Sequence, residues 1–331
     1  MRYVTIAELS DMIRHNLWKI PHDIDLVVGI PRSGLMAANL IALYLNKRLS
    51  DIDSFINGNI FECGERGKYI EKVNVRKVLV IDDSVGSGSS MTKAKAKLAS
   101  LTSKYDFVFA SPIVTTLGEK YVDVFFEVID DNRVFEWNIF HHSIIENCCF
   151  DIDGVLCCNP EEDDDGKKYE TFLKETKPLF APSVTIDSLV TCRLEKYRRQ
   201  TEEWLDRNKI TYRNLIMLNL PDKYSRDTWG KHGEYKGEYY KNSDCQLFIE
   251  SSYYEASIIA RVSNKPVLCI ETNELLFVSS ETKFKKTKRR IRKHIPHTYQ
   301  LMQRLFTLFR QGVQNTNGNL KKKMVRKNLT K

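Results

Sequence analysis

Long hydrophobic runs, cysteines at metal-binding spacing and a secretory leader are all missing from this sequence of 331 residues. The longest uncharged stretch with a helical pattern, residues 33–46, is shorter than the roughly 20 residues that a membrane-spanning helix needs. The eight cysteines include no Cys-x-x-Cys, so we expect reduced thiols rather than a zinc site or a disulfide framework. The N-terminus lacks the apolar run of a signal peptide, and we therefore expect a cytoplasmic protein.

Positive charge is concentrated at the C-terminal end. The net charge is +8, and 16 of the 51 lysines and arginines lie in residues 281–331, so the rest of the chain is mildly acidic. Apolar side chains in this segment fall on one helical face, which predicts a basic amphipathic tail. Three interpretations remain open: a solvated tail, peripheral attachment to the anionic inner face of the cell membrane and, least favoured, contact with nucleic acid.

Strand-like and helix-like segments alternate in two series. In the first, apolar runs at 24–30, 76–83 and 106–114 alternate with helical patterns at 35–45 and after residue 89. In the second, runs at 147–156, 184–193, 214–220, 244–252 and 265–272 are interrupted by helical patterns at 194–208 and 253–262. Such alternation is typical of parallel sheets with crossover helices. We predict an α/β protein with two doubly wound parallel-sheet domains, 1–146 and 147–280, followed by a tail at 281–331.

The run VLVIDDSVGSGSSM joins a strand, two carboxylates and a loop of small residues. Glycines at 86 and 88 let backbone amides converge ahead of a helix N-terminus, an arrangement that suits a phosphate. The neighbouring Asp82 and Asp83 can accept hydrogen bonds from a ribose diol. The run lacks the Gly-Lys-Ser/Thr of a Walker loop and the third glycine of a dinucleotide site. A sugar phosphate is therefore the expected ligand.

A second loop of this kind, GIPRSG, follows the preceding strand. With both loops in this order, residues 20–135 resemble the type I phosphoribosyltransferases. The resemblance implies that Asp82 and Asp83 hold the ribose hydroxyls of phosphoribosyl pyrophosphate, directly or through Mg²⁺. It implies that the 5-phosphate is held by Ser84, Val85, Gly86, Ser87, Gly88, Ser89 and Ser90. It also implies that the pyrophosphate is held by Gly29, Pro31, Arg32, Ser33 and Gly34.

Two positions in these loops bear on the reaction. Displacement of pyrophosphate passes through an oxocarbenium-like state, so a cation that stabilises the leaving anion aids catalysis, and Arg32 is the candidate. Gly86 stands where purine-specific members often carry an aspartate as general base. A purine acceptor handled in that way is therefore not expected.

The second domain opens with an Asp-x-Asp motif after the buried run 148–150. Side chains two residues apart at a strand end point the same way, so Asp151 and Asp153 can face one phosphoryl group. With Thr191, Lys236 and Glu250 following in order, residues 148–272 resemble the phosphatases of the haloacid dehalogenase superfamily.

This second resemblance implies a role for each residue. Asp151 attacks phosphorus and Asp153 protonates the leaving oxygen. Thr191 hydrogen-bonds the phosphoryl group, and Lys236, with Lys231 as the alternative, neutralises its charge. Mg²⁺ is held by Asp151, the main-chain carbonyl of Asp153, and Glu250. Glu250 precedes a serine where many members have a second aspartate, and Glu255 is either a support for the site or part of a helix face. The short insertions leave no room for a large cap domain, so an open site is expected.

Together the two sites predict consecutive reactions. The chain resembles the two-component ribofuranosyltransferases of bacterial surface polysaccharides. That resemblance implies transfer of 5-phosphoribose from phosphoribosyl pyrophosphate to a glycan acceptor, lipid-linked at the membrane, and removal of the 5-phosphate. The alternatives are a nucleotide salvage enzyme with nucleotidase activity and a regulator that senses phosphoribosyl pyrophosphate. Formation of a homo-oligomer stays open.

Overall fold

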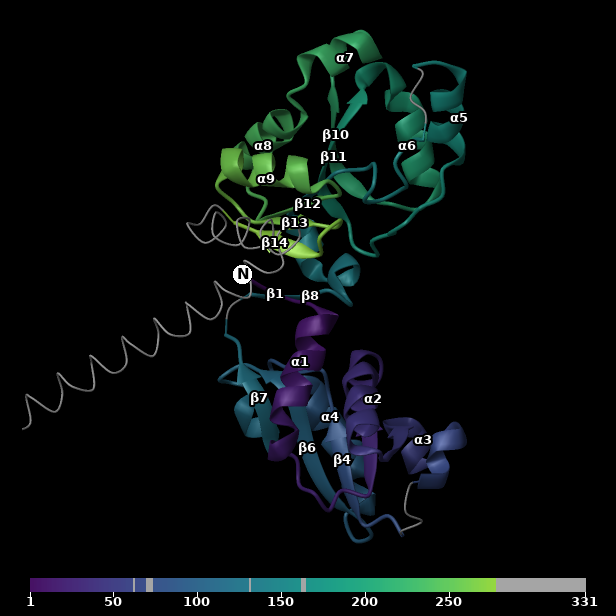
Figure 1. The fold of residues 1–331 in the computed structure, drawn as a ribbon, viewed down its shortest axis with the longest axis vertical. Coiled ribbons are helices and arrows are strands. Elements are labelled where there is room, and N and C mark those ends of the chain that lie inside the picture. The colour runs from purple at the N-terminus through teal and green to yellow at the C-terminus, as the bar shows by residue number, and fades with distance from the viewer. Residues whose placement is uncertain (62, 70–73, 131, 162–164, 278–331) are drawn as a thin grey trace, which may run out of the picture.

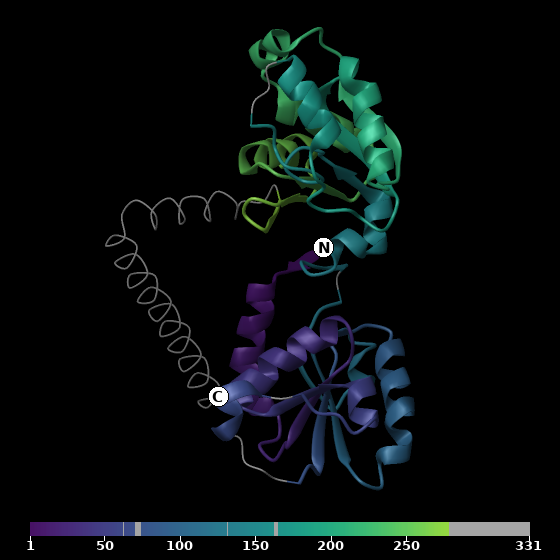
Figure 2. The same ribbon diagram turned by 90° about the vertical axis from the view of Figure 1, so that its right-hand side faces the viewer.

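Two α/β units lie one above the other along the longest axis of the molecule (Figures 1 and 2). The structure is a computed structural model that describes residues 1–277, apart from 62, 70–73, 131 and 162–164. The basic tail expected at 281–331 lies outside the described residues. Within the described part, no helix is long and apolar enough to cross a membrane.

The unit nearer the N-terminus is built on a parallel sheet. Strands β3, β2, β4 and β6 pair in this order, and β5 and β7 both pair with β6. Because β4 pairs with the first half of β6 and β5 with its second half, the two residues between β4 and β5 lie at mid-sheet. Those residues are Asp82 and Asp83. The strands are β2 (Leu26–Gly29), β3 (Arg48–Asp51), β4 (Lys77–Ile81), β5 (Ser84–Val85), β6 (Asp106–Val114) and β7 (Val124–Val128).

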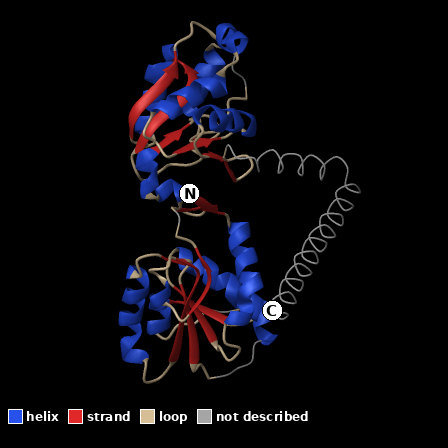
Figure 3. Cartoon of the chain, turned by 90° about the vertical axis from the view of Figure 1, so that its left-hand side faces the viewer, coloured by secondary structure: helices blue, strands red, loops and turns tan. Residues whose placement is uncertain are grey.

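Helices cover both faces of this sheet (Figure 3). Alternate residues of a strand point to opposite faces, so Val27 and Leu79 pack with α1 and α2 whereas Val28 and Val80 pack with α3 and α4. All four side chains are fully buried, and each such side chain stabilises the fold by roughly 1.5–3 kcal/mol. The helices are α1 (Ile6–Asn16), α2 (Ser33–Leu45), α3 (Ile52–Ile56) and α4 (Ser89–Leu98).

A two-stranded parallel ribbon, β1 (Arg2–Val4) with β8 (Arg133–Phe135), lies between the two units (Figure 1). Val4 and Phe135 belong to the core of the first unit, whereas Tyr3 and Val134 belong to the core of the second. The Tyr3 hydroxyl donates to Asn273 Oδ1 at 2.6 Å. The ribbon is therefore shared between both units.

The second unit contains another parallel sheet. Its order is β11-β10-β9-β12-β13-β14, and β14 alone runs antiparallel to its neighbour among these strands. The first strand along the chain, β9, lies near the middle, so the residues after it meet those after β10 and β12. The strands are β9 (Cys148–Phe150), β10 (Ile186–Leu194), β11 (Tyr212–Leu218), β12 (Leu247–Glu250), β13 (Val267–Cys269) and β14 (Glu274–Leu276).

Helices again cover both faces of the sheet. Trp204 of α6 packs with Phe150 and Leu189 on one face, and Tyr240 of α8 packs with Phe248 on the other. The helices are α5 (Lys167–Glu175), α6 (Arg198–Arg207), α7 (Lys223–Trp229), α8 (His232–Asn242) and α9 (Tyr253–Ser263).

The predicted α/β architecture with parallel sheets is confirmed, but one predicted helix start is wrong. The helix expected at 194–208 begins at Arg198, because Leu194 is still part of β10 and pairs with Leu218 of β11. Leu194 is buried, and a short 3-10 helix, Glu195–Tyr197, separates the strand from α6. The antiparallel β14 was also not predicted.

Candidate active sites

Asp82 and Asp83 form a buried acidic pair at the carboxyl end of β4, with exposed fractions of 7% and 5%. The Asp83 amide donates to Asp82 Oδ1 at 3.0 Å, and the Trp137 indole Nε1 donates to Asp83 Oδ2 at 2.8 Å. Burial and the neighbouring charge of Asp83 raise the pKa of Asp82 to about 8. Two adjoining carboxylates with so few donors around them can bind ligand hydroxyls or a cation.

The loop of residues 29–34 lies directly against this pair. A Cβ atom on Gly34 would meet Ile81 O at 2.8 Å and Asp82 Oδ1 at 3.0 Å, so only glycine lets α2 begin this close to β4. Arg32, at the N-cap of α2, is exposed. The structure thus brings the GIPRSG loop and the acidic pair together at the carboxyl ends of the neighbouring strands β2 and β4.

The loop of small residues after the acidic pair ends at the first turn of α4. Gly88 is the N-cap of α4 and has φ +77°, a conformation that glycine adopts without strain. Its side-chain position is filled by the ring of Tyr121, which a Cβ atom would meet at 2.2 Å. Ser87, Ser89 and Ser90 are exposed, and no side chain caps the amides of the first turn of α4. The loop therefore presents amides and hydroxyls that suit an anion.

Arg133 and Trp137 also lie at this site, although neither was predicted from the sequence. The Arg133 guanidinium lies beside Gly86, where a Cβ atom would meet Nη2 at 2.7 Å. The Trp137 ring stacks on Phe135 with centroids 4.8 Å apart and holds Asp83 through its indole nitrogen. No short motif marks these residues, because they reach the acidic pair only through the pairing of β8 with β1.

The family comparison agrees with this geometry. Residues 3–142 match the model of the phosphoribosyl transferase domain family. The match supports a phosphoribosyl transferase domain over these residues. The match supports phosphoribosyltransferase activity with phosphoribosyl pyrophosphate as the donor. No curated protein shows a significant match to the chain.

Several solved structures are similar to the chain at low identity. A purine phosphoribosyltransferase from Pyrococcus horikoshii is 16% identical, covers 41% of this chain and 92% of its own, and has a TM-score of 0.31. A xanthine-guanine-hypoxanthine phosphoribosyltransferase from Helicobacter pylori is also 16% identical. The match covers 42% of this chain and 95% of that one, with a TM-score of 0.33. A chain of the Pnkp1/Rnl/Hen1 RNA repair complex is 11% identical. The match covers 76% of this chain and 97% of that one, with a TM-score of 0.30.

Outside the phosphoribosyl transferase domain, a second polar cluster surrounds Lys236. This buried ammonium donates to Asp151 Oδ2 at 2.8 Å, Glu250 Oε2 at 2.9 Å and Glu255 Oε2 at 2.7 Å. Lys236 rather than the alternative Lys231 contacts Asp151, and Glu255 supports the cluster. Burial opposes the charged form of Lys236, but the three carboxylates raise its pKa above the usual value.

The carboxylates around Lys236 have different pKa shifts. Burial and the charges of Glu250, Asp153 and Glu255 raise the pKa of Asp151, although Lys236 opposes the shift. Burial acts on Glu255 as well, but the nearby His232, whose Nδ1 lies 3.6 Å from Oε1, and the hydrogen bond from Lys236 lower its pKa to about 2. The cluster thus contains more carboxylates than ammonium groups.

Asp153 is oriented away from this cluster. Its carboxylate accepts from the buried Arg193, with Nη2 to Oδ1 at 2.7 Å and Nε to Oδ2 at 3.1 Å. Its main-chain carbonyl accepts from Ser251 Oγ at 3.1 Å. Thr191 is buried within β10, and its Oγ1 accepts from the Arg193 amide at 3.2 Å. The role of Arg193 was not predicted from the sequence. An arginine within an apolar run, where burial is expected, is itself a sign of an acidic partner.

The oxygen donors expected for Mg²⁺ lie at the carboxyl ends of β9 and β12. In the part of the chain that the structure describes, no three acidic, histidine or cysteine side chains are arranged as a metal site. The set expected from the sequence is two carboxylates, of Asp151 and Glu250, with the carbonyl of Asp153. Hard oxygen ligands and an excess of negative charge fit Mg²⁺. The donor set therefore suits this ion.

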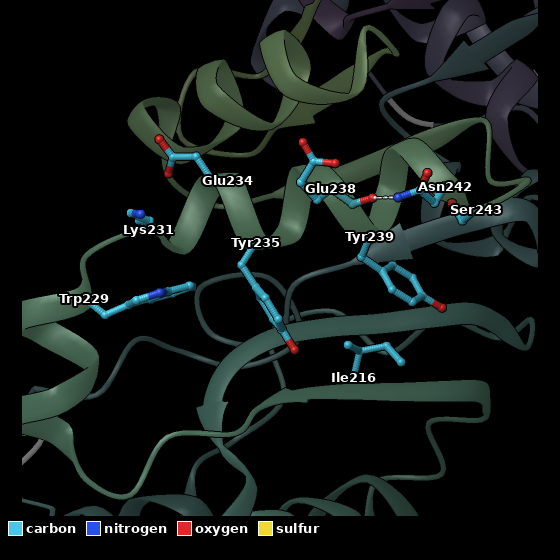
Figure 4. A pocket seen from close by; sticks show the side chains of 9 residues that line it. All are labelled: Ile216, Trp229, Lys231, Glu234, Tyr235, Glu238, Tyr239, Asn242 and Ser243. Carbon is cyan, nitrogen blue, oxygen red and sulfur yellow. Dashed lines mark hydrogen bonds between the residues drawn. The ribbon is translucent and has the colours of Figure 1, made fainter.

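A hollow of about 580 Å³ lies on another side of α8 (Figure 4). The rings of Tyr235 and Tyr239 point from α8 toward Ile216, whereas Glu234 and Glu238 point to the opposite side of the helix. Trp229 and Lys231 complete one end of the hollow. It offers aromatic ring surfaces with carboxylates at the margin.

Proposed function

We propose that the chain transfers 5-phosphoribose from phosphoribosyl pyrophosphate to a glycan acceptor and then removes the 5-phosphate, leaving ribofuranose. The two steps are assigned to the phosphoribosyl transferase domain and to a second domain that resembles the haloacid dehalogenase phosphatases. The observation that carries the second step is the buried contact of Lys236 with Asp151 and Glu250, which groups the candidate nucleophile, cation and metal ligand.

In the transfer step, a hydroxyl oxygen of the acceptor attacks C1 of the phosphoribose. The bond from C1 to the pyrophosphate oxygen breaks, its electron pair leaves with pyrophosphate, and the hydroxyl proton passes to solvent. Asp82 and Asp83 hold the ribose hydroxyls, and Arg32 offsets charge on the leaving group. The loop 84–90 holds the 5-phosphate through amides and hydroxyls.

In the second step, the Asp151 carboxylate attacks phosphorus and the bond to the sugar O5 breaks. O5 takes up a proton from Asp153, the assigned donor, which must first leave the ion pair with Arg193 seen in this structure. Water then hydrolyses the aspartyl phosphate to release inorganic phosphate. Lys236 and Thr191 hold the phosphoryl oxygens. Mg²⁺, when bound by Asp151, Glu250 and the Asp153 carbonyl, offsets the charge of the phosphoryl group.

Two features support a glycan acceptor. Gly86 provides no acidic base for a purine, and the space beside it is filled by Arg133. The hollow along α8 presents the ring surfaces of Trp229 and Tyr235, against which a sugar ring can pack. A lipid-linked acceptor and attachment of the tail to an anionic membrane surface remain predictions from the sequence.

Replacement of the nucleophile tests the sequence of two steps. Asp151→Asn removes the attacking carboxylate and keeps the side-chain size, so phosphoribose transfer should continue in the other domain. The variant should accumulate an acceptor that carries one phosphate group more than the wild-type product. Mass spectrometry detects this group, and added nonspecific phosphatase should remove it.

The control is Asp206→Asn, which changes an exposed acid on α6 and should yield the wild-type product. Dephosphorylated product at the wild-type rate from Asp151→Asn would show that Asp151 is not the nucleophile. Consumption of a free base rather than a glycan would instead favour nucleotide salvage. Ligand binding without turnover would favour a regulator.

A further inference from the structure

Arg133 places a half-buried cation against the loop that is assigned to the 5-phosphate. Its Nη2 lies 2.7 Å from where a Cβ atom of Gly86 would be, so the guanidinium fills the space of the side chain that Gly86 lacks. Gly86 itself does not have a positive φ. A side chain at position 86 is therefore excluded by Arg133 rather than by the backbone conformation.

This guanidinium is incompletely hydrogen-bonded. Arg133 Nη1 is buried and has no hydrogen-bond partner among the described residues. Buried donors are nearly always paired, and a charged donor more so than a neutral one, so such an atom requires an explanation. The nearby acids bind other groups: Asp83 accepts from Trp137, and Asp130 accepts from the Thr116 amide and hydroxyl at 2.8 and 2.6 Å.

The loop beside Arg133 has no positive side chain of its own. Residues 84–90, SVGSGSS, offer hydroxyls and amides but neither lysine nor arginine. Hydrogen bonds in which the donor is charged are shorter and about twice as strong as neutral ones. A cation fixed at Gly86 would therefore add to the binding of an anion at this loop.

The position along the sheet separates Arg133 from the pyrophosphate loop. The loop 29–34 follows β2, on one side of the acidic pair that ends β4. Arg133 lies against Gly86, which follows β5, and β5 pairs with β6 on the other side of β4. An anion at Arg133 is thus distinct from the departing pyrophosphate.

We propose that Arg133 binds an oxyanion of a substrate at the transferase site, on the side of Asp82 and Asp83 opposite to the pyrophosphate loop. Two sources share this chemistry: the 5-phosphate of the donor, and a carboxylate or phosphate group on the acceptor. The inference rests on the proposed transferase function, because it takes its ligands from that reaction.

Calorimetric titration of the full chain separates the two sources. We expect Arg133→Gln to weaken ribose 5-phosphate binding at least tenfold if the 5-phosphate is the ligand, with Arg133→Lys recovering part of the loss and magnesium pyrophosphate binding unchanged. If the anion belongs to the acceptor, ribose 5-phosphate binding stays unchanged. The wild-type protein saturated with ribose 5-phosphate should then bind inorganic phosphate, and Arg133→Gln should not.

Arg14→Gln, which alters an exposed arginine on α1, is the matched control and should behave as wild type in every titration. Agreement of Arg133→Gln with wild type within twofold for all three probes would overturn the inference and leave the transferase function standing. Failure of the wild-type protein to bind ribose 5-phosphate or pyrophosphate would instead overturn the transferase function, and the inference with it. Thermal melts of both Arg133 variants show whether they remain folded.

Discussion

Two carboxyl groups of this chain show how surroundings set the charge of one kind of side chain. The pKa of Asp82 is raised to about 8 by burial and by the adjoining charge of Asp83. Glu255 is half-buried, yet its pKa is lowered to about 2 because His232 lies beside it and Lys236 donates to it. The first acid can gain a cation or hydroxyl ligands, whereas the second already has its cation.

The raised pKa of Asp82 predicts a pH-dependent cost in stability. Between its unfolded value near 4 and about 8, the folded chain binds more protons at Asp82 than the unfolded chain. The free energy of unfolding therefore falls as pH rises through this window, by up to about 1.4 kcal/mol per unit. Asp82→Asn removes this dependence and should stabilise the protein more at pH 8 than at pH 5.

Urea unfolding at several pH values measures the difference. Asp206→Asn, which removes a carboxylate from the exposed surface of α6, provides the control. A constant difference between Asp82→Asn and wild type from pH 5 to pH 8 would contradict a raised pKa at this carboxyl.

At the scale of elements, the sequence predicted what is contiguous along the chain. Strand β4, the acidic pair, the small-residue loop and α4 follow one another, so their chemistry can be read from one run of residues. Arg133 and Trp137 reach the same site through a ribbon that pairs β8 with the distant β1. Their placement depends on a long-range pairing that leaves no local pattern.

The start of α6 and the partner of Asp153 show the same limit. The apolar Leu194 fits a helix or a strand equally well by pattern, and only its pairing with Leu218 decides for the strand. The ion pair of Arg193 with Asp153 connects neighbouring strands, so spacing in the sequence could not predict it.

The phosphate loop depends on glycine for two separate reasons, which a pair of variants distinguishes. Gly88 has φ +77° and its side-chain space is filled by Tyr121, whereas Gly58 has φ +80° with open space around it. An alanine in this conformation costs roughly 1–2 kcal/mol. Gly58→Ala should show that cost alone, and Gly88→Ala should exceed it and also raise the KM for phosphoribosyl pyrophosphate.

Thermal melts and pyrophosphate release measure the two effects. Gly58→Ala should leave the KM unchanged, because Gly58 lies outside both loops. Equal loss of stability in the two variants, with an unchanged KM in both, would argue against the close packing of Tyr121 on the loop.

For the whole molecule, the β1–β8 ribbon connects the two units through side chains that alternate along it. Val4 and Phe135 pack in the first core, and Tyr3 and Val134 pack in the second. The same ribbon carries Arg133, which lies beside Gly86, and leads to Trp137, which donates to Asp83. Packing in the second core is therefore mechanically linked to the geometry of the first site.

This link predicts that a change in one unit alters activity in the other. Val134→Ala removes buried volume from the second core, and we expect it to loosen β8 and to lower the rate of pyrophosphate release severalfold. Val267→Ala removes the same volume from a core of the second unit that does not include β8, and it should leave the rate unchanged. Hydrogen exchange reports whether the β8 amides open faster in the first variant than in the second. Faster exchange at β8 with an unchanged rate of release would show that the ribbon joins the two units without positioning Arg133 and Trp137 for the transfer.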